Sequence, residues 1–186
     1  MMTSSYISIA EKIRHGGVVG YPTESVFGLG CDPHDAAAVA RIFELKQRDP
    51  GQGFLLIAAD LQQIARYIDA AQVPAEVRIR IESGWPGPST WIFPASREVP
   101  AWISGRHTGI AVRVTAHGPA AALCRAFGGA LVSTSANPHG LPPARTAAEV
   151  DAYFPGQLAA VLDEPVGTLA QPTSIRDALT GRVVRA

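Results

Sequence analysis

Cysteine is scarce in this sequence, and long apolar runs are missing altogether. The 186 residues include two cysteines, Cys31 and Cys124, which have no CxxC or Cys/His ligand spacing around them, so neither a disulfide framework nor a zinc site is indicated. No run approaches the roughly 18 consecutive apolar residues of a transmembrane helix. The N-terminus, MMTSSYISIAEKIRHG, lacks the basic region and the small-residue cleavage site of a signal peptide. We therefore expect a cytoplasmic protein that is not attached to a membrane.

A surplus of charge of either sign is also absent. The chain has 16 basic and 16 acidic residues, and this balance argues against a protein that coats nucleic acid non-specifically. The charge is unevenly distributed, because residues 61–130 contain seven arginines and four acidic side chains. A local basic surface is therefore compatible with the sequence.

The residues that are present indicate a compact α/β protein. Apolar residues make up 47% of the chain and charged residues 17%, which suits one substantial domain over residues 1–186. Helical and strand-like patterns alternate, with helices expected at 5–15, 35–48, 60–68, 73–84, 118–129 and 145–154, and strands at 18–22, 53–59, the latter part of 85–94, 109–114, 130–136, 158–163, 173–178 and 182–186. The last strands are too close together for helical crossovers, so we predict a mixed parallel and antiparallel sheet flanked by helices.

Two details of this pattern can be checked directly. Asp35 and Asp60 stand where they can accept hydrogen bonds from the first turns of the second and third helices, and we expect both to be N-caps. The stretch 23–33, TESVFGLGCDP, is expected to be a glycine-containing loop after the first strand.

Familiar catalytic templates are missing, and polar residues at strand ends take their place. The sequence has no GxxxxGK[ST], GxGxxG, HExxH or GxSxG motif. The five histidines are scattered and are better explained as surface or hydrogen-bonded residues than as catalytic bases.

YPTES follows a predicted strand and has two interpretations. It is either a turn in which Thr23 and Ser25 satisfy backbone groups, or part of a site that Gly28 and Gly30 open to close approach by a ligand.

Three further stretches have two interpretations each. VSTSAN (132–137) supplies uncharged donors for a nucleotide or an amino acid, or it is a capping loop. Lys46 and Arg48 are a solvated helix terminus that gains from the helix dipole, or a pair of cations for a polyphosphate. Arg113, within the apolar run GIAVRV, lies on a solvated face or meets an anion, because a buried unpaired charge is costly.

Taken in order, these stretches resemble the YrdC-like family, and most closely its short single-domain TsaC-type threonylcarbamoyl-AMP synthases. The matching pieces are YPTESVFGLGCDP, ELKQR, FLLIA, WPGPST, AVRV, LVSTSAN, GLPPARTAAEV and SIRDALTG. The resemblance implies a twisted α/β fold with a mixed sheet around a concave, positively lined cavity. It also implies an enzyme that makes threonylcarbamoyl-AMP and pyrophosphate from L-threonine, bicarbonate and ATP. A separate transferase complex would then use the product to build threonylcarbamoyladenosine in tRNA.

The resemblance implies roles for individual residues on the nucleotide side. Lys46 and Arg48 match the family's Lys-x-Arg and are expected to hold the ATP phosphates. Ser135 and Asn137 match its Ser-x-Asn, which contacts the nucleotide, and these four are the implied catalytic residues. Two more residues are expected to face the nucleotide, namely Thr90 and Arg185. Mg²⁺ is expected with the triphosphate, and its protein ligands are unknown.

On the amino-acid side, the resemblance implies a threonine-binding set. Thr23, Arg113 and Ser133 match the family pattern directly. Thr173 or Ser174 is expected to close on the substrate, and the sequence does not choose between them. Weak contact with tRNA or double-stranded RNA alongside catalysis is also part of this expectation.

Two positions depart from the family pattern, and two other functions compete. Gln52 stands where many relatives have a further lysine, and His139 lies in a loop, NPHG, that often reads Asn-x-Ser-Gly.

The main alternative function is a double-stranded RNA or tRNA-binding module with vestigial nucleotide binding, which zero net charge disfavours. Carbamoyl-adenylate chemistry of hydrogenase maturation is the other, but those proteins carry acylphosphatase and zinc-finger regions that this chain lacks.

Overall fold

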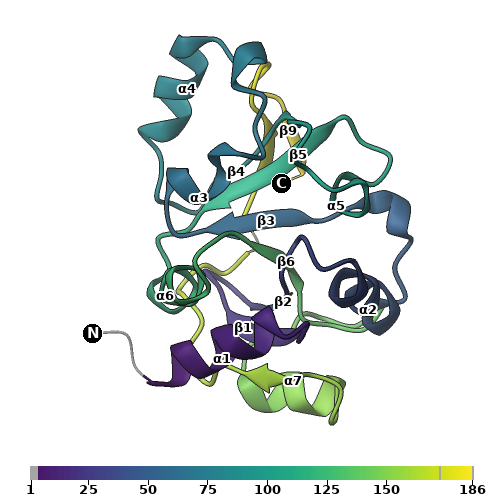
Figure 1. Ribbon diagram of the computed structural model, residues 1–186. Coiled ribbons are helices and arrows are strands. Elements are labelled where there is room, and N and C mark those ends of the chain that lie inside the picture. The colour runs from purple at the N-terminus through teal and green to yellow at the C-terminus, as the bar shows by residue number, and fades with distance from the viewer. Residues whose placement is uncertain (1–3, 172, 186) are drawn as a thin grey trace.

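The computed structural model describes residues 4–171 and 173–185. In that part of the chain, nine strands form one sheet in the order β7-β1-β2-β6-β3-β5-β4-β8-β9 (Figure 1). The strands are β1 (Val19–Pro22), β2 (Phe27–Gly30), β3 (Leu55–Ala58), β4 (Thr90–Pro94), β5 (Gly109–Val114), β6 (Leu131–Ser135), β7 (Ala160–Val161), β8 (Ile175–Asp177) and β9 (Val183–Arg185). The pairs β1–β7, β3–β5 and β4–β8 are parallel and the other neighbours are antiparallel. The predicted mixed sheet is confirmed.

Seven helices flank the sheet in the described part of the chain, and six of them lie in ranges where the sequence predicts a helix. They are α1 (Ser4–Arg14), α2 (Ala36–Lys46), α3 (Leu61–Ala65), α4 (Ala75–Glu82), α5 (Ala101–Ser104), α6 (Gly118–Phe127) and α7 (Ala147–Tyr153). Both predicted caps are confirmed, since Asp35 accepts from the Ala38 amide at 3.0 Å and Asp60 from the Gln63 amide at 3.1 Å. The structure adds α5, which the sequence pattern did not indicate, and two 3₁₀ turns, η1 (Pro50–Gln52) and η2 (Ala70–Gln72).

Alternation along the strands divides the core into two clusters. In β3, Leu56 packs with one cluster and Ile57 with the other, because successive side chains of a strand point to opposite faces. Helices α1 and α6 cover one face and contribute Ile9 and Leu123. Helix α2 contributes Ile42 to the opposite cluster. The central strands therefore bury apolar residues on both faces of the sheet.

The loop expected at 23–33 is partly wrong, because it contains strand β2. Its glycines do not mark irregular backbone but close packing between strands. A Cβ on Gly30 would come within 2.6 Å of both the Tyr21 ring and the Val132 carbonyl oxygen. The predicted strand at 158–163 is reduced to β7, and the strand predicted at 182–186 ends at residue 186, which lies outside the described residues.

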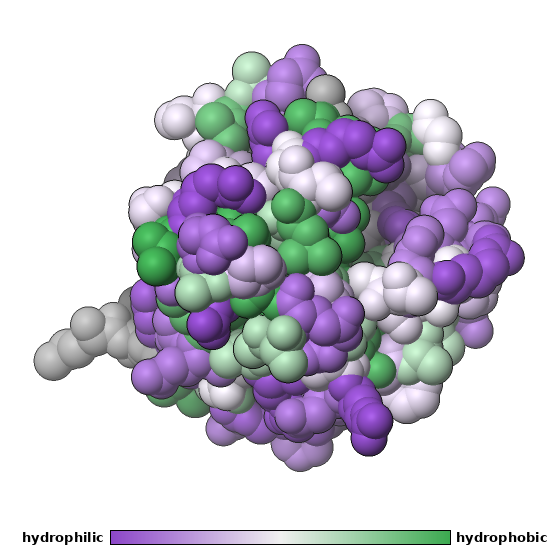
Figure 2. Space-filling view, turned by 90° about the horizontal axis from the view of Figure 1, so that it is seen from above, coloured by the Kyte–Doolittle hydropathy of each residue, from purple (hydrophilic) through white to green (hydrophobic). Residues whose placement is uncertain are grey.

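The far end of the sheet is partly open to solvent. Figure 2 views the molecule from the end where α4 and β9 lie in Figure 1, and apolar side chains are interspersed there among hydrophilic ones. The exposed apolar residues of these elements include Ile79 and Val184. Within the described ranges, none of the helices combines the length and apolar character needed to cross a membrane.

Candidate functional site

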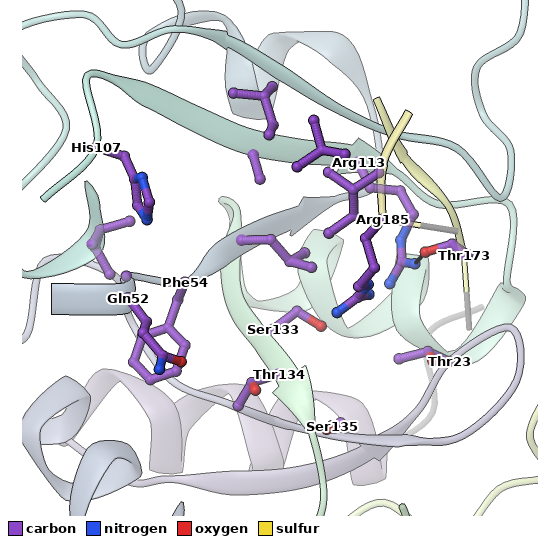
Figure 3. A pocket seen from close by; sticks show the side chains of 18 of the residues that line it. Thr23, Gln52, Phe54, His107, Arg113, Ser133, Thr134, Ser135, Thr173 and Arg185 are labelled. Atoms are coloured by element: carbon purple, nitrogen blue, oxygen red, sulfur yellow. Dashed lines mark hydrogen bonds between the residues drawn. The ribbon is translucent and has the colours of Figure 1, made fainter. Parts of the chain in front are cut away.

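A cavity of about 540 Å³ lies over strands β5 and β6, and residues along both strands line it (Figure 3). Its walls come from the β1–β2 turn, β5 and β6, the loops 48–55 and 103–109, and the C-terminal strands β8 and β9. Segments far apart in the sequence therefore meet at one place. The described residues of the lining include three arginines, Arg48, Arg113 and Arg185, and no acidic side chain.

Arg113 anchors one end of the cavity. Its side chain is buried, with an exposed fraction of 5%. Nη1 donates to Thr173 Oγ1 at 2.6 Å, and Nη2 lies 3.5 Å from Glu24 Oε2. The solvated-face interpretation of this arginine is thus wrong, and its anion in this structure is the carboxylate of Glu24.

Glu24 was not among the residues predicted for the site. It belongs to the YPTES motif and is buried, with Oε1 accepting a hydrogen bond of 2.6 Å from Thr115 Oγ1. Among the described residues, Glu24 Oε2 and Arg113 Nε have no hydrogen-bond partner. The signal that could have identified Glu24 is a carboxylate directly after a buried strand, since such a charge needs a partner in the fold.

Hydroxyl groups surround this arginine. Thr23 and Ser133 line the cavity near it, and Figure 3 shows both together with Thr173 on the side of Arg113. Thr23 Oγ1 donates to the Val26 carbonyl at 2.8 Å. Thr90 is completely buried behind Thr173, with 3.4 Å between their hydroxyl oxygens. Thr90 therefore reaches the cavity only through Thr173.

Arg48 and Arg185 carry the positive charge of the remaining cavity. Arg48 stacks over Phe54, 5.0 Å from the ring centroid, and its Nη1 lies 3.4 Å from Thr134 Oγ1. Burial and the charge of Arg185 lower the pKa of Arg48. Burial and the charge of Arg113 likewise lower the pKa of Arg185. The three guanidinium groups repel one another, so the cavity favours an anionic ligand.

Lys46 is buried rather than solvated, so the interpretation as a free helix terminus is wrong for this residue. Its Nζ donates to Ser135 O at 2.6 Å, Asn137 O at 3.0 Å and Asn137 Oδ1 at 3.2 Å. Burial and the neighbouring charge of Arg48 lower its pKa to about 8. The Asn137 amide group in turn donates to the Leu141 carbonyl at 2.8 Å. Lys46 and Asn137 together fix the end of β6.

The sequence-predicted residues thus fall into two groups. Those that line the cavity are Thr23, Arg48, Arg113, Ser133, Ser135, Thr173 and Arg185, and those outside its lining are Lys46, Thr90, Asn137 and Ser174. The structure adds Phe54, Thr134 and His107 to the lining. Phe54 begins a run that sequence patterns mark only as a buried strand. In the described part of the chain, no cluster of three or more His, Cys, Asp or Glu side chains is arranged to hold a metal ion.

Comparison with known proteins identifies the family. Residues 11–186 match the Sua5/YciO/YrdC family model, whose description is "Telomere recombination". Proteins named threonylcarbamoyl-AMP synthase are similar to this chain. That of Halorhodospira halophila is 54% identical over 95% of this chain and 91% of its own length, and that of Xylella fastidiosa is 47% identical over both full lengths.

A solved structure supports the same family assignment. P. abyssi Sua5 complexed with L-threonine superposes with a TM-score of 0.86 and 31% identity, over 92% of this chain. This chain spans 50% of that longer protein. The chain therefore belongs to the Sua5/YciO/YrdC family.

Proposed function

We propose that this chain is a threonylcarbamoyl-AMP synthase, which makes L-threonylcarbamoyladenylate and pyrophosphate from L-threonine, bicarbonate and ATP. The observation that carries the proposal is the cavity lining, in which three arginines stand beside a row of hydroxyls without an acidic side chain among the described residues. Such a lining suits a polyphosphate together with an amino-acid carboxylate. The names of the similar proteins support the same reaction.

We assign threonine to the end of the cavity that holds Arg113. A guanidinium binds a carboxylate through paired N–H donors, and Arg113 Nε has no hydrogen-bond partner within residues 4–171 and 173–185. Thr23 and Ser133 offer hydroxyls for the polar groups of the substrate. We choose Thr173 over Ser174 for the remaining contact, because Thr173 lines the cavity and bonds to Arg113.

We assign ATP to the part of the cavity beside Arg48, Arg185 and Ser135. Burial and, after it, the charge of Arg185 lower the pKa of Arg48, and an anion placed between the two arginines relieves their repulsion. Lys46 and Asn137 belong to the same site, where they hold the end of β6 against α2. We place Thr90 with the threonine end instead, because it is buried and its hydroxyl oxygen lies 3.4 Å from that of Thr173.

The chemistry needs positioned cations rather than a protein nucleophile. The amine of threonine and bicarbonate form a carbamate with loss of water. A carbamate oxygen then attacks the α-phosphorus of ATP, and the bond from that phosphorus to pyrophosphate breaks. Negative charge accumulates on phosphate oxygens in the transition state, and fixed guanidinium and hydroxyl groups stabilise it. Holding both substrates in line supplies the rest of the acceleration.

We propose that Mg²⁺ enters this site bound to the triphosphate. The described lining offers hydroxyls but no carboxylate, whereas Mg²⁺ in nucleotide sites is usually held by phosphates, water and one or two carboxylates. When bound, the ion would neutralise phosphate charge. The protein residues assigned above bind and orient the substrates without serving as its ligands.

We also propose where the product goes. The adenylate would pass to a separate transferase complex that modifies tRNA, and the site of this reaction would be the cytoplasm. Residues 1–186 would act as one YrdC-like domain. The arginine surplus in residues 61–130 supports weak contact with tRNA or double-stranded RNA during that transfer.

A substrate-omission assay tests this function. Pyrophosphate release from ATP should require both threonine and bicarbonate, and mass spectrometry should detect threonylcarbamoyl-AMP. Arg48→Ala should abolish adenylate formation with an unchanged circular dichroism spectrum. Arg41→Ala is the matched control, since Arg41 lies on α2 and pairs with Glu44 at the surface. Equal pyrophosphate release without threonine would contradict the proposal.

A further inference from the structure

Strand β2 contains two glycines on one face, Gly28 and Gly30, and packing alone accounts for only the second. A Cβ on Gly30 would lie 2.6 Å from both the Tyr21 ring and the Val132 carbonyl oxygen, so no larger residue fits there. A Cβ on Gly28 would come no closer than 3.3 Å to any neighbour, the nearest being the Thr134 carbonyl oxygen, and a shift of a few tenths of an ångström accommodates it. The φ of Gly28 also lies outside the left-handed region. Since glycine weakens the interior of a strand, the empty space at Gly28 calls for another explanation.

The register of the sheet places Gly28 beside the hydroxyl groups of the cavity. Gly28 pairs with Tyr21 of β1 and with Ser135 of β6, and side chains of directly opposed residues point to the same face. Ser133, two residues before Ser135, shares that face because side chains alternate along a strand. Gly28, Ser133 and Ser135 all line the cavity, and Figure 3 labels both serines. Gly28 is therefore a gap in a row of side chains that face the ligand.

The gap is bounded by one hydroxyl and one methyl group. A Cβ on Gly28 would lie 3.5 Å from Ser133 Oγ and 3.5 Å from Thr23 Cγ2. The hydroxyl of Thr23 is already used, since it donates to the Val26 carbonyl at 2.8 Å. A threonine ligand also carries one hydroxyl and one methyl on its Cβ. Its hydroxyl would find a hydrogen-bond partner in Ser133, and its methyl would pack against Thr23 Cγ2 above the Cα of Gly28.

We propose that Gly28 is a specificity-determining residue, whose missing side chain leaves the space that the methyl group of threonine fills. This inference rests on the proposed function for the identity of the substrate. Threonine differs from serine by this one methyl group, so Gly28 sets the preference for threonine over serine. An alanine at this position would put its own methyl into the same space, where it would exclude threonine and still admit serine.

Calorimetric titration with L-threonine and L-serine tests this role without any turnover. The wild-type protein should bind threonine more tightly than serine. Gly28→Ala should bind threonine about tenfold more weakly than the wild type, which is within the range for one misplaced methyl group, and serine within about twofold. The ratio of the two affinities in one preparation does not depend on the fraction of protein that is folded, so a modest loss of stability cannot imitate the result.

Gly118→Ala is the matched control. Gly118 begins α6 outside the cavity lining, and a Cβ there would meet nothing within 4 Å. This variant should keep the wild-type ratio of threonine affinity to serine affinity. ATP is the third probe, and Gly28→Ala should bind it within about twofold of the wild type.

Three results would overturn the inference. They are an equal loss of threonine and serine affinity in Gly28→Ala, an unchanged threonine affinity, and a loss of ATP affinity as large as that for threonine, which would place the nucleotide at Gly28. Pyrophosphate release that requires threonine and bicarbonate is measured separately on the wild type. If that synthesis is absent while Gly28→Ala selectively weakens threonine binding, the proposed function fails and the role of Gly28 stands. If synthesis is present and the ratio of affinities is unchanged, the role of Gly28 fails and the proposed function stands.

Discussion

The two ends of the cavity differ in how much of their polar chemistry the protein already uses. At the Arg113 end, the guanidinium is buried and contacts Thr173 and Glu24, so most of its environment is set by the fold. At the opposite end, Gln52 and His107 are exposed, and their side chains make no hydrogen bond with the part of the chain that the structure describes. Contacts within the protein hold the first end in place, whereas the second end keeps exposed polar groups.

The difference has an energetic cause. A buried arginine without a counter-charge is costly, so the Arg113 end must carry its own carboxylate even when empty. The exposed donors of the other end are satisfied by water and need no such compensation. We expect substitutions at the buried end to change stability, and substitutions at the open end to change ligand affinity with the fold intact.

The largest expected effect comes from removing the counter-charge of Arg113. Glu24→Gln keeps the shape of the side chain but leaves a buried guanidinium without an anion, and it should lower the free energy of unfolding by about 3 kcal/mol. Urea denaturation monitored by circular dichroism measures this. Glu98→Gln is the control, because Glu98 pairs with Arg66 at the surface and its loss should change stability by less than about 1 kcal/mol. Equal, small changes in the two variants would contradict the comparison.

An intermediate effect is expected from the pH dependence of Lys46. Its pKa of about 8 lies below the ordinary value of 10.5, so between those pH values the unfolded chain holds a proton that the folded protein has released. Stability should therefore rise with pH across this window, relative to a variant without the ammonium group. Lys46→Met should lack this rise in urea denaturation measured from pH 7 to pH 10.

ATP binding should respond to the same titration with the opposite sign. As pH rises through about 8, Lys46 loses the positive charge that it places beside the ATP end, so the ATP affinity of the wild type should fall. Lys46→Met should start with lower affinity and stay flat over this step. A parallel fall in both proteins, measured at constant Mg²⁺, would show that Lys46 does not act on ATP through its charge.

The smallest expected effect concerns Thr90, and it shows whether this residue acts on the nucleotide directly or on threonine through Thr173. Thr90→Val removes one long hydrogen bond to Thr173, and it should raise the KM for threonine by about threefold while leaving the KM for ATP unchanged. Steady-state kinetics with each substrate varied in turn would measure this. A rise in the KM for ATP alone would mean that Thr90 contacts the nucleotide directly, as the family resemblance implies.

Local signals in the sequence were sufficient for most helices and strands. The caps Asp35 and Asp60 and the continuous apolar run of β3 depend on neighbours a few residues away, so they can be recognised without the fold. Strand β2 was missed because Gly30, taken as a loop residue, is required by contact with Tyr21 and Val132 across the sheet. That reason is tertiary and leaves no local signature.

The site divides in the same way. The sequence by itself determined which polar residues stand at strand ends, and the order of its motifs pointed to the family. Only the tertiary structure decided the partners. It buried Lys46 against the end of β6 and paired Arg113 with Glu24, 89 positions apart by their numbers. It also brought His107 into the same cavity lining as Gln52. A buried charge is costly unless a partner lies close to it, and here the partners come from distant segments of the chain. The topology of the sheet decides which segments those are.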